Sequence, residues 1–245
     1  QSAHPAAVEG RATTAANGTV TSDLVRFAQT LRYEDLPANV IDAAKRCVLD
    51  AVGCTLAGWQ TTKGRLAAET MVRLGGPAES QIFGHQARIA ATNAAFANAE
   101  LMNGLDFDAI PHIPPVLLPA LLAVAEARKT SGKDLLLAVV IGYELAARLS
   151  SASSAMQIAL LETGTTPEVF GINQEAQMST AAAVARMLGL SADATASAVG
   201  ISGYYCPPQS SHDWETGSPK SNIKYTPVGW INQGAVTAAL LAEAG

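Results

Sequence analysis

Alanine-rich stretches constrain the fold of this chain more than any other feature of its sequence. Residues 90–99 read AATNAAFANA, and alanine has the highest intrinsic helix propensity. Side chains this small also allow neighbouring helices to approach closely. Apolar residues recur at helical spacing along most of the chain, whereas we find no alternating strand pattern, internal repeat or heptad. The pattern predicts an all-α fold.

Caps and breakers delimit the predicted helices. Ser22 is the expected N-cap of the first helix, Pro37 suits a first turn, and Ser191 is expected to cap a later helix. Residues 81–83 are predicted to form a short extended piece, and residues 150–173, rich in Ser, Thr and Gly, a mobile or site-lining loop. The predicted helices span residues 23–31, 37–58, 63–74, 89–105, 116–129, 134–149, 175–188, 192–201 and 228–244.

Composition excludes several classes of protein. A chain of 245 residues with 49% hydrophobic residues has ample material for a core. Its net charge of -5 argues against a nucleic-acid-binding surface. The longest apolar runs, residues 116–125 and 135–142, are too short to cross a bilayer, so no membrane partner is expected. We therefore predict a soluble, cytoplasmic protein.

The first residues carry little pattern. Residues 1–20 are predicted to be a flexible arm, and residues 21–245 one helical domain. The start without Met and the acceptor pattern at Asn17 leave open a secreted or processed protein.

The three cysteines, Cys47, Cys54 and Cys206, have neither zinc-site nor iron–sulfur spacing. They are interpreted as packing thiols, and no metal site is predicted.

A cluster of chemical groups lies where a predicted helix gives way to a Pro-rich loop. Asp106, Asp108 and His112 fall within the stretch NGLDFDAIPH. Paired carboxylates beside an imidazole can supply a general base near neutral pH. The alternative is structural, because aspartates commonly form turns and caps. Both interpretations stay open on these residues alone.

A second polar stretch, residues 220–230, runs into the last predicted helix. Lys220 and Lys224 could hold a substrate carboxylate, aided by the dipole of that helix. A solvated loop is the alternative. His212, Asp213 and Trp214 in the same loop are weaker candidates.

Taken together, these segments resemble the MmgE/PrpD family, whose members include 2-methylcitrate dehydratase and cis-aconitate decarboxylase. The similarity extends over nearly the whole chain after the arm. The similar segments are residues 94–98, 105–108, 118–126, 142–148, 181–190, 229–230 and 234–242, together with His112 and Lys224.

The resemblance implies a cofactor-independent lyase or isomerase acting on a small di- or tricarboxylate. It implies His112 as acid or base, Asp106 as its partner or an additional base, and Lys224 as a carboxylate clamp. Asp108, Lys220 and Tyr225 are the expected substrate contacts. Family members are longer and add a smaller α/β domain, which this chain is expected to lack. We therefore expect a homo-oligomer, such as a dimer, or a split enzyme completed by a second chain.

Departures from the family pattern keep an alternative open. Ala109 and Ile110 replace an expected Thr, and two expected histidines are absent, with Phe170, Asn173 and Gln174 near one position and Thr226 and Pro227 near the other. The alternative is a non-catalytic scaffold or binding subunit that pairs with an active homologue.

Overall fold

The protein is described from a computed structural model, which covers residues 18–164, 175–206, 218–222, 224 and 226–245. The predicted all-α fold is confirmed, because helices form nearly all of the regular structure in these ranges. The predicted arm at residues 1–20 falls almost entirely outside them. The elements are α1 (Val20–Thr30), η1 (Tyr33–Asp35), α2 (Ala38–Ala57), η2 (Gly58–Gln60), α3 (Thr62–Leu74), β1 (Ser80–Gln81), β2 (Arg88–Ile89), α4 (Ala91–Met102), α5 (Pro114–Arg128), α6 (Gly132–Glu162), α7 (Ala176–Met187), α8 (Ala192–Tyr204) and α10 (Val228–Ala244).

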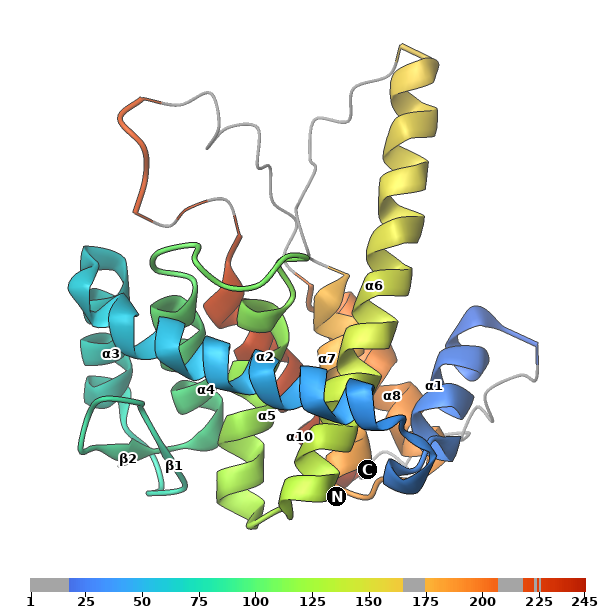
Figure 1. The fold of residues 1–245 in the computed structure, drawn as a ribbon, viewed down its shortest axis with the longest axis horizontal. Coiled ribbons are helices and arrows are strands. Elements are labelled where there is room, and N and C mark those ends of the chain that lie inside the picture. Colours follow the sequence, from blue (N-terminus) through green and yellow to red (C-terminus); the bar gives the residue numbers. More distant parts are fainter. Residues whose placement is uncertain (1–17, 165–174, 207–217, 223, 225) are drawn as a thin grey trace, which may run out of the picture.

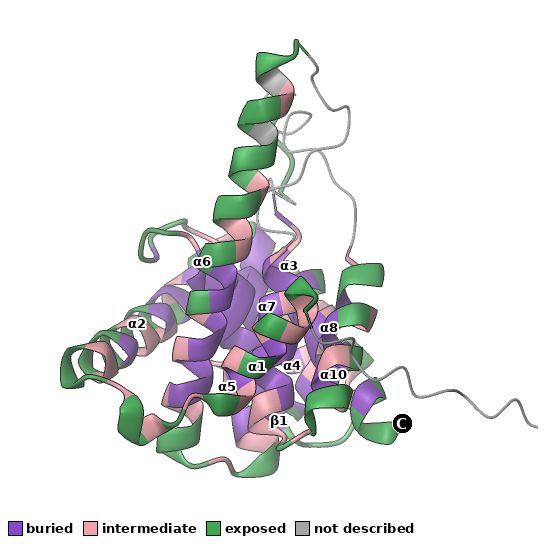
Figure 2. Cartoon of the chain, turned by 90° about the vertical axis from the view of Figure 1, so that its right-hand side faces the viewer, coloured by how far each residue is buried: buried purple, intermediate pink, exposed green. Residues whose placement is uncertain are grey.

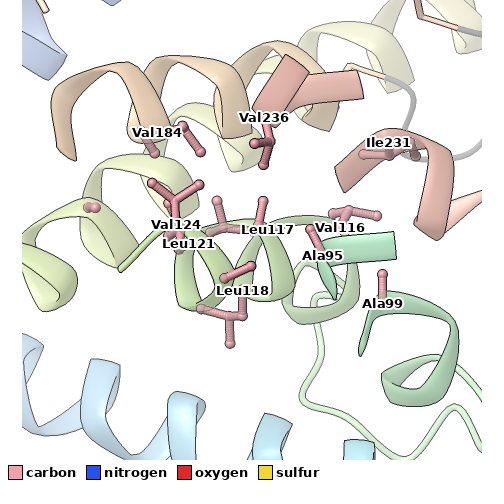
Figure 3. Packing of buried hydrophobic residues seen from close by; sticks show 14 of the residues in the cluster. Ala95, Ala99, Val116, Leu117, Leu118, Leu121, Val124, Val184, Ile231 and Val236 are labelled. Carbon is pink, nitrogen blue, oxygen red and sulfur yellow. The ribbon is translucent and has the colours of Figure 1, made fainter. Parts of the chain in front are cut away.

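The core is built around α4 and α5, which pack on each other and on α10, while α5 also packs on α7 (Figures 1 and 3). Leu117, Leu118 and Leu121 of α5 are fully buried. The alanines of α4 at positions 94, 95, 97 and 99 are also fully buried, so the close helix approach expected from the alanine-rich stretch is confirmed. The tight packing of α4 fixes the direction in which the chain leaves its C-terminal end.

Pro119 lies inside α5, where its ring removes one backbone donor and leaves the carbonyl of Pro115 without its usual partner. Asn232 of α10 replaces the missing bond, because its amide nitrogen donates to that carbonyl at 2.7 Å. Its oxygen accepts from the amide of Ala120 at 2.9 Å. The side chain of Thr180 on α7 donates to the carbonyl of Val116 at 2.8 Å. Buried polar groups thus tie α10 and α7 to the interrupted helix.

The predicted loop at residues 150–173 is wrong over its first part, because α6 continues through the serines to Glu162. Residues 165–174 lie outside the described residues. The first half of α6 is buried against the core through Leu137, Ile141 and Leu145, while its second half projects from the domain and is mostly exposed (Figures 1 and 2). A helix already nucleated by packing is extended at little cost per residue, even by serine.

Helix α6 as a whole is more apolar and longer than the uninterrupted apolar run at residues 135–142 indicated. Residues 132–160 are long and apolar enough to cross a membrane by length and composition, and 39% of their most apolar part is buried inside the protein. Core helices of water-soluble proteins satisfy the same criterion. Since α6 contributes Leu137 and Leu145 to the core, its apolar composition has a packing role in this fold.

Helix α1 begins three residues earlier than predicted. Its N-cap is Thr19, whose hydroxyl accepts from the amide of Ser22 at 3.1 Å. The Ser22 hydroxyl in turn accepts from the amide of Thr19 at 3.1 Å. Ser22 is therefore the third residue of a capping box and not the cap. The predicted cap of α8 is confirmed, since the Ser191 hydroxyl accepts from the amide of Ala194 at 3.2 Å.

The extended piece predicted near residues 81–83 belongs to a short antiparallel pair, in which Ser80 faces Ile89 and Gln81 faces Arg88. Buried Asn98 of α4 supports it. Its oxygen accepts from the amide of Phe83 at 2.9 Å, and its nitrogen donates to the carbonyl of Gln81 at 3.0 Å. One amide on α4 thus anchors this hairpin at the side of the domain.

Candidate active site

The site is built on the loop that joins α4 to α5. Asn103, fully buried, caps the C-terminal end of α4. Asp106 then adopts a left-handed backbone with φ of 54°, which turns the chain back toward α5. His112 follows just before that helix, and its Nδ1 lies 2.8 Å from Oδ2 of Asp108. The turn brings the predicted carboxylates and imidazole into one cluster.

Asp108 is the buried member of this cluster, with none of its side chain exposed. Its Oδ2 contacts His112, while its Oδ1 has no hydrogen-bond partner among the described residues. A buried carboxylate gains from a neighbouring group that can donate a proton or carry positive charge. The arrangement therefore suits an imidazole that becomes charged during a reaction.

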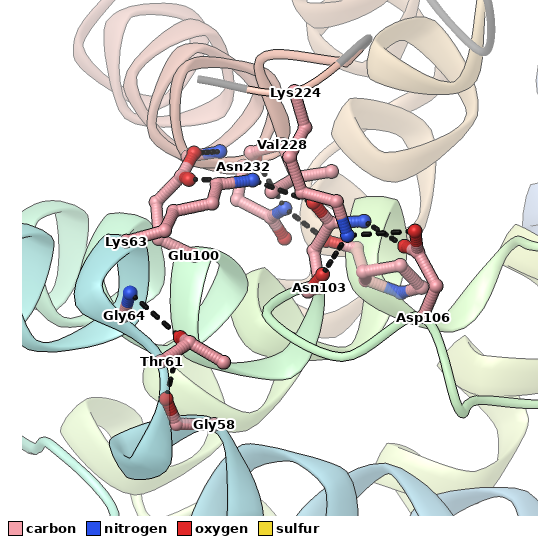
Figure 4. Close-up of polar contacts among 12 residues, drawn as sticks. Gly58, Thr61, Lys63, Gly64, Glu100, Asn103, Asp106, Lys224, Val228 and Asn232 are labelled. Carbon is pink, nitrogen blue, oxygen red and sulfur yellow. Dashed lines mark hydrogen bonds and ion pairs between the residues drawn. The ribbon is translucent and has the colours of Figure 1, made fainter. Parts of the chain in front are cut away.

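Lys224 reaches the same cluster from the other end of the chain. Its ammonium lies 2.7 Å from Oδ2 of Asp106 and donates to the carbonyl of Asn103 at 2.7 Å (Figure 4). Lys224 also has a left-handed backbone, with φ of 64°. Non-glycine residues in this conformation are uncommon and cluster at functional sites. Two such residues are here paired with each other.

A second, deeper layer consists of Lys63 on α3 and Glu100 on α4 (Figure 4). The Lys63 ammonium lies 3.0 Å from Oε2 of Glu100 and donates to Oδ1 of Asn103 at 2.5 Å. Oε1 of Glu100 accepts from the amide of Gly229, at the start of α10, at 2.8 Å. Burial lowers the pKa of Lys63, an effect that Glu100 opposes.

The amide of Asn103 connects the two layers. Its nitrogen donates to Oδ1 of Asp106 at 3.0 Å and lies 3.1 Å from Nε2 of His112. Asn103 therefore contacts Lys63, Asp106, His112 and Lys224 at once. The side chain of Asn103 contacts three of these groups, and its backbone carbonyl accepts from the fourth, Lys224.

The structure brings together four of the predicted site residues, namely Asp106, Asp108, His112 and Lys224. Lys220 is exposed in the segment before Lys224. Tyr225 and the weaker candidates lie outside the described residues, the latter being His212, Asp213 and Trp214.

Sequence reasoning missed Lys63, Glu100 and Asn103 as parts of the site. One signal was available for Glu100, because it is the only acidic residue in the alanine-rich segment from Ala90 to Met102. A charge inside a helix that carries no other charged residue and is mostly buried needs a buried partner. The identity of that partner, Lys63, is not encoded in any local pattern.

A mostly apolar groove of about 270 Å³ adjoins the loop on the side of α2 and α6. It is lined by Ala109, Ile110 and Pro111 from the loop and by Cys47 and Tyr143 from the two helices. The Cys47 sulfur lies 2.9 Å from the Tyr143 hydroxyl. The groove gives the site a hydrophobic neighbour but no additional cation.

The three cysteines are free thiols, as the interpretation of packing residues requires. Burial raises the pKa of Cys47 and Cys54. It also raises the pKa of Cys206 to about 11. These thiols are protonated near neutral pH and have little nucleophilic character.

The geometry combines an imidazole between two carboxylates with an ammonium group at the exposed edge. Such a set can move a proton next to a carboxylate and stabilise the negative charge that results. Within the described ranges, no group of three or more His, Cys, Asp or Glu is arranged to hold a metal ion.

Residues 22–245 match the MmgE/PrpD N-terminal domain, and the chain belongs to the MmgE/PrpD family. Individual relatives support this assignment. The cis-aconitate decarboxylase-like protein oryM of Aspergillus oryzae is 33% identical over 196 residues, which are 75% of this chain and 39% of the relative. A cis-aconitate decarboxylase of Aspergillus terreus is 27% identical over 193 residues, 74% of this chain and 38% of the relative. The Homo sapiens cis-aconitate decarboxylase is 32% identical over 139 residues, 53% of this chain and 29% of the relative.

The aligned part of the chain therefore spans less than two fifths of the length of these relatives.

Proposed function

We propose that this protein takes part in lyase chemistry of the dehydration or decarboxylation type on a small di- or tricarboxylate similar to aconitate. The observation that carries the proposal is the cluster in which Lys224, Asp106 and His112 meet. The Lys224 ammonium lies 2.7 Å from Oδ2 of Asp106, and Nε2 of His112 lies 3.8 Å from Oδ1 of the same carboxylate. Family membership and the names of the relatives support the choice of substrate class.

In the proposed dehydration, His112 takes a proton from the carbon next to a substrate carboxylate, the hydroxyl group on the neighbouring carbon departs, and the imidazolium protonates it to water. In the proposed decarboxylation, the bond to one carboxylate breaks to release carbon dioxide, and the imidazolium of His112 protonates the carbon skeleton that keeps the bonding electrons. Asp108 stabilises the imidazolium formed in between. Lys224 holds the carboxylate and stabilises the charge that develops on its oxygens. Proton abstraction by His112 would also serve an isomerase, in which the proton returns to a different carbon and no group leaves.

Charge balance defines what the substrate must displace. With neutral His112, the cluster holds three carboxylates, Glu100, Asp106 and Asp108, and two ammonium groups, Lys63 and Lys224. A polycarboxylate therefore has to compete with Asp106 for Lys224. Asp106 has 38% of its side chain exposed, which allows such an exchange. The exposed Lys220, together with Tyr225, is proposed as a further substrate contact. Asp108, which was also expected to contact the substrate, has a fully buried side chain and is instead assigned as the partner of His112.

The test is to incubate the purified chain with cis-aconitate in deuterated water and to follow carbon dioxide release and deuterium incorporation. We expect His112→Gln and Lys224→Met to lower turnover at least about 100-fold, the usual scale for losing acid–base catalysis. Matched controls are His85→Gln, which changes a histidine stacked on Trp59, and Lys129→Met, which changes an exposed lysine with φ of 55°. Unchanged turnover in the site variants refutes the proposal.

A non-catalytic binding or scaffold subunit is the second candidate. The altered segment at Ala109 and Ile110 and the absence of the two expected histidines favour it. This candidate predicts that dicarboxylates raise the melting temperature, that Lys224→Met removes the effect, and that no turnover occurs in either protein.

A further inference from the structure

The direction of the hydrogen bonds in the deeper layer is determined by Lys63. An ammonium group only donates, so the atom of Asn103 that lies 2.5 Å from the Lys63 nitrogen has to be the amide oxygen. Glu100 holds Lys63 in place from the other side at 3.0 Å. The NH2 group of Asn103 is thereby directed away from Lys63, toward Asp106 and His112. The orientation of this amide follows from chemistry, although oxygen and nitrogen have similar shapes.

The orientation of the amide in turn determines which imidazole nitrogen carries the proton. The NH2 group of Asn103 has two hydrogens, and its neighbours are Oδ1 of Asp106 at 3.0 Å and Nε2 of His112 at 3.1 Å. Both neighbours have to accept. A proton on Nε2 would oppose this NH2 group, whose nitrogen lies 3.1 Å away.

The other imidazole nitrogen fits the same assignment. Nδ1 lies 2.8 Å from Oδ2 of Asp108, an ionised carboxylate that can only accept. A proton on Nδ1 satisfies this contact, which is otherwise between two acceptors. The bonds then run in one consistent sense from Lys63 through Asn103 and His112 to Asp108.

We propose that Lys63 and Asn103 are positioning residues that hold His112 as the neutral imidazole with its proton on Nδ1 and its lone pair on Nε2. Lys63 acts through Asn103, and Asn103 acts through its bond to Nε2. Neither residue is needed as an acid or base. The inference rests on the proposed function only for its catalytic meaning, because Nε2 is then the atom that accepts the substrate proton.

The same chain of contacts reaches the start of α10. The amide of Gly229 donates to Glu100, and Glu100 holds Lys63. A Cβ atom at Gly229 would lie 2.8 Å from Oε1 of Glu100 and from the ring of Phe96, so the absence of a side chain lets the backbone approach. The segment that carries Lys224 is thus connected to His112 by two routes, one from Lys224 through Asn103 and one through Glu100 and Lys63 in the buried layer.

Nitrogen NMR spectra of the histidine-labelled chain test the proposal without substrate, because the chemical shifts of the two ring nitrogens distinguish the tautomers. His112 is assigned by loss of its signals in His112→Gln, among the four histidines of the chain. We expect protonated Nδ1 and unprotonated Nε2 near neutral pH. Protonated Nε2 in the unmodified protein overturns the proposal whatever the turnover. The expected tautomer with no turnover of cis-aconitate refutes the proposed function and leaves this inference standing.

Asn103→Asp provides the second measurement, because it replaces the donor NH2 by an acceptor of the same shape. The new carboxylate would face Lys63, Asp106 and His112, so we expect Nε2 to gain a proton. Asn98→Asp is the matched control, since Asn98 is also buried on α4 but bonds to Phe83 and Gln81. An unchanged His112 spectrum in Asn103→Asp, or the same change in Asn98→Asp, overturns the role of Asn103.

Lys63→Arg and Lys63→Gln test the role of the ammonium. Arginine also only donates, so the tautomer of His112 is expected to persist. Glutamine offers both an oxygen and an NH2 group, which allows Asn103 to turn over and both tautomers to be populated. A single unchanged tautomer in Lys63→Gln overturns the role given to Lys63.

Discussion

Two ion pairs of the site have similar nitrogen–oxygen distances but differ in how far their side chains are exposed to solvent. Lys63 and Glu100 are 3.0 Å apart, with 8% and 10% of their side chains exposed. Lys224 and Asp106 are closer, at 2.7 Å, but have 15% and 38% of their side chains exposed. The shorter pair is therefore the more accessible one. Burial, rather than distance, decides which pair is fixed and which can be opened by a ligand.

The physical reason is the cost of taking charge out of water. Breaking a buried pair leaves the remaining charge without compensation, whereas an exposed pair is replaced by water at little cost. Lys63 and Glu100 accordingly suit a structural role behind Asn103. Lys224 and Asp106 suit a role in which their partners change.

The largest expected effect comes from breaking the buried pair. Lys63→Met leaves Glu100 with the amide of Gly229 but without its cation, and should lower the free energy of unfolding by about 3–5 kcal/mol. Urea denaturation measures this change. Arg46→Met is the control, because Arg46 and Asp42 have 69% and 60% of their side chains exposed, and should cost no more than about 1 kcal/mol. Equal losses in the two variants would contradict the distinction between the pairs.

An effect of intermediate size is expected from pH, because burial lowers the pKa of Lys63 in the folded state. Between this lowered value and the unfolded value of about 10.4, the folded protein binds fewer protons than the unfolded chain, so stability contributed by this group rises with pH. Below the folded pKa both states carry the proton, and the contribution is constant.

The measurement is the difference in unfolding free energy between the unmodified protein and Lys63→Met, taken from neutral pH to about pH 10. Groups other than Lys63 largely cancel in this difference. We expect the unmodified protein to gain relative to the variant as pH rises. A difference that stays flat or falls would show that burial does not dominate at Lys63.

The smallest expected effect on stability comes from opening the accessible pair. Lys224→Met should lower the free energy of unfolding by only about 1–2 kcal/mol, since water can solvate Asp106 in its place and the main loss is the bond to the carbonyl of Asn103. The same variant should lose the rise in melting temperature that a dicarboxylate produces in the unmodified protein. A large loss of stability here would mean that the two pairs have equivalent structural roles.

Local sequence patterns predicted the helices well where packing and propensity agree, as in the alanine-rich stretch that became α4. They failed at residues 150–162, where serines suggested a loop. That segment continues a helix whose first half is anchored in the core by Ile141 and Leu145, and propagation outweighs the weak preference of serine. The prediction of Ser22 as the N-cap was wrong for a different reason: Thr19 and Ser22 form a capping box, and both are residue types that cap helices well.

The sequence by itself determined that Asp106, Asp108 and His112 would gather at the end of a helix, because they lie within seven residues of one another beside a turn. It placed Lys224 with them only through resemblance to a family. The tertiary structure decided that Lys63, Glu100 and Asn103 form the layer behind them. Lys224 and Asn103 are 121 positions apart, and Lys63 and Asn103 are 40 apart. Such contacts depend on how whole helices pack, and no local pattern of residues specifies which buried charge will meet which.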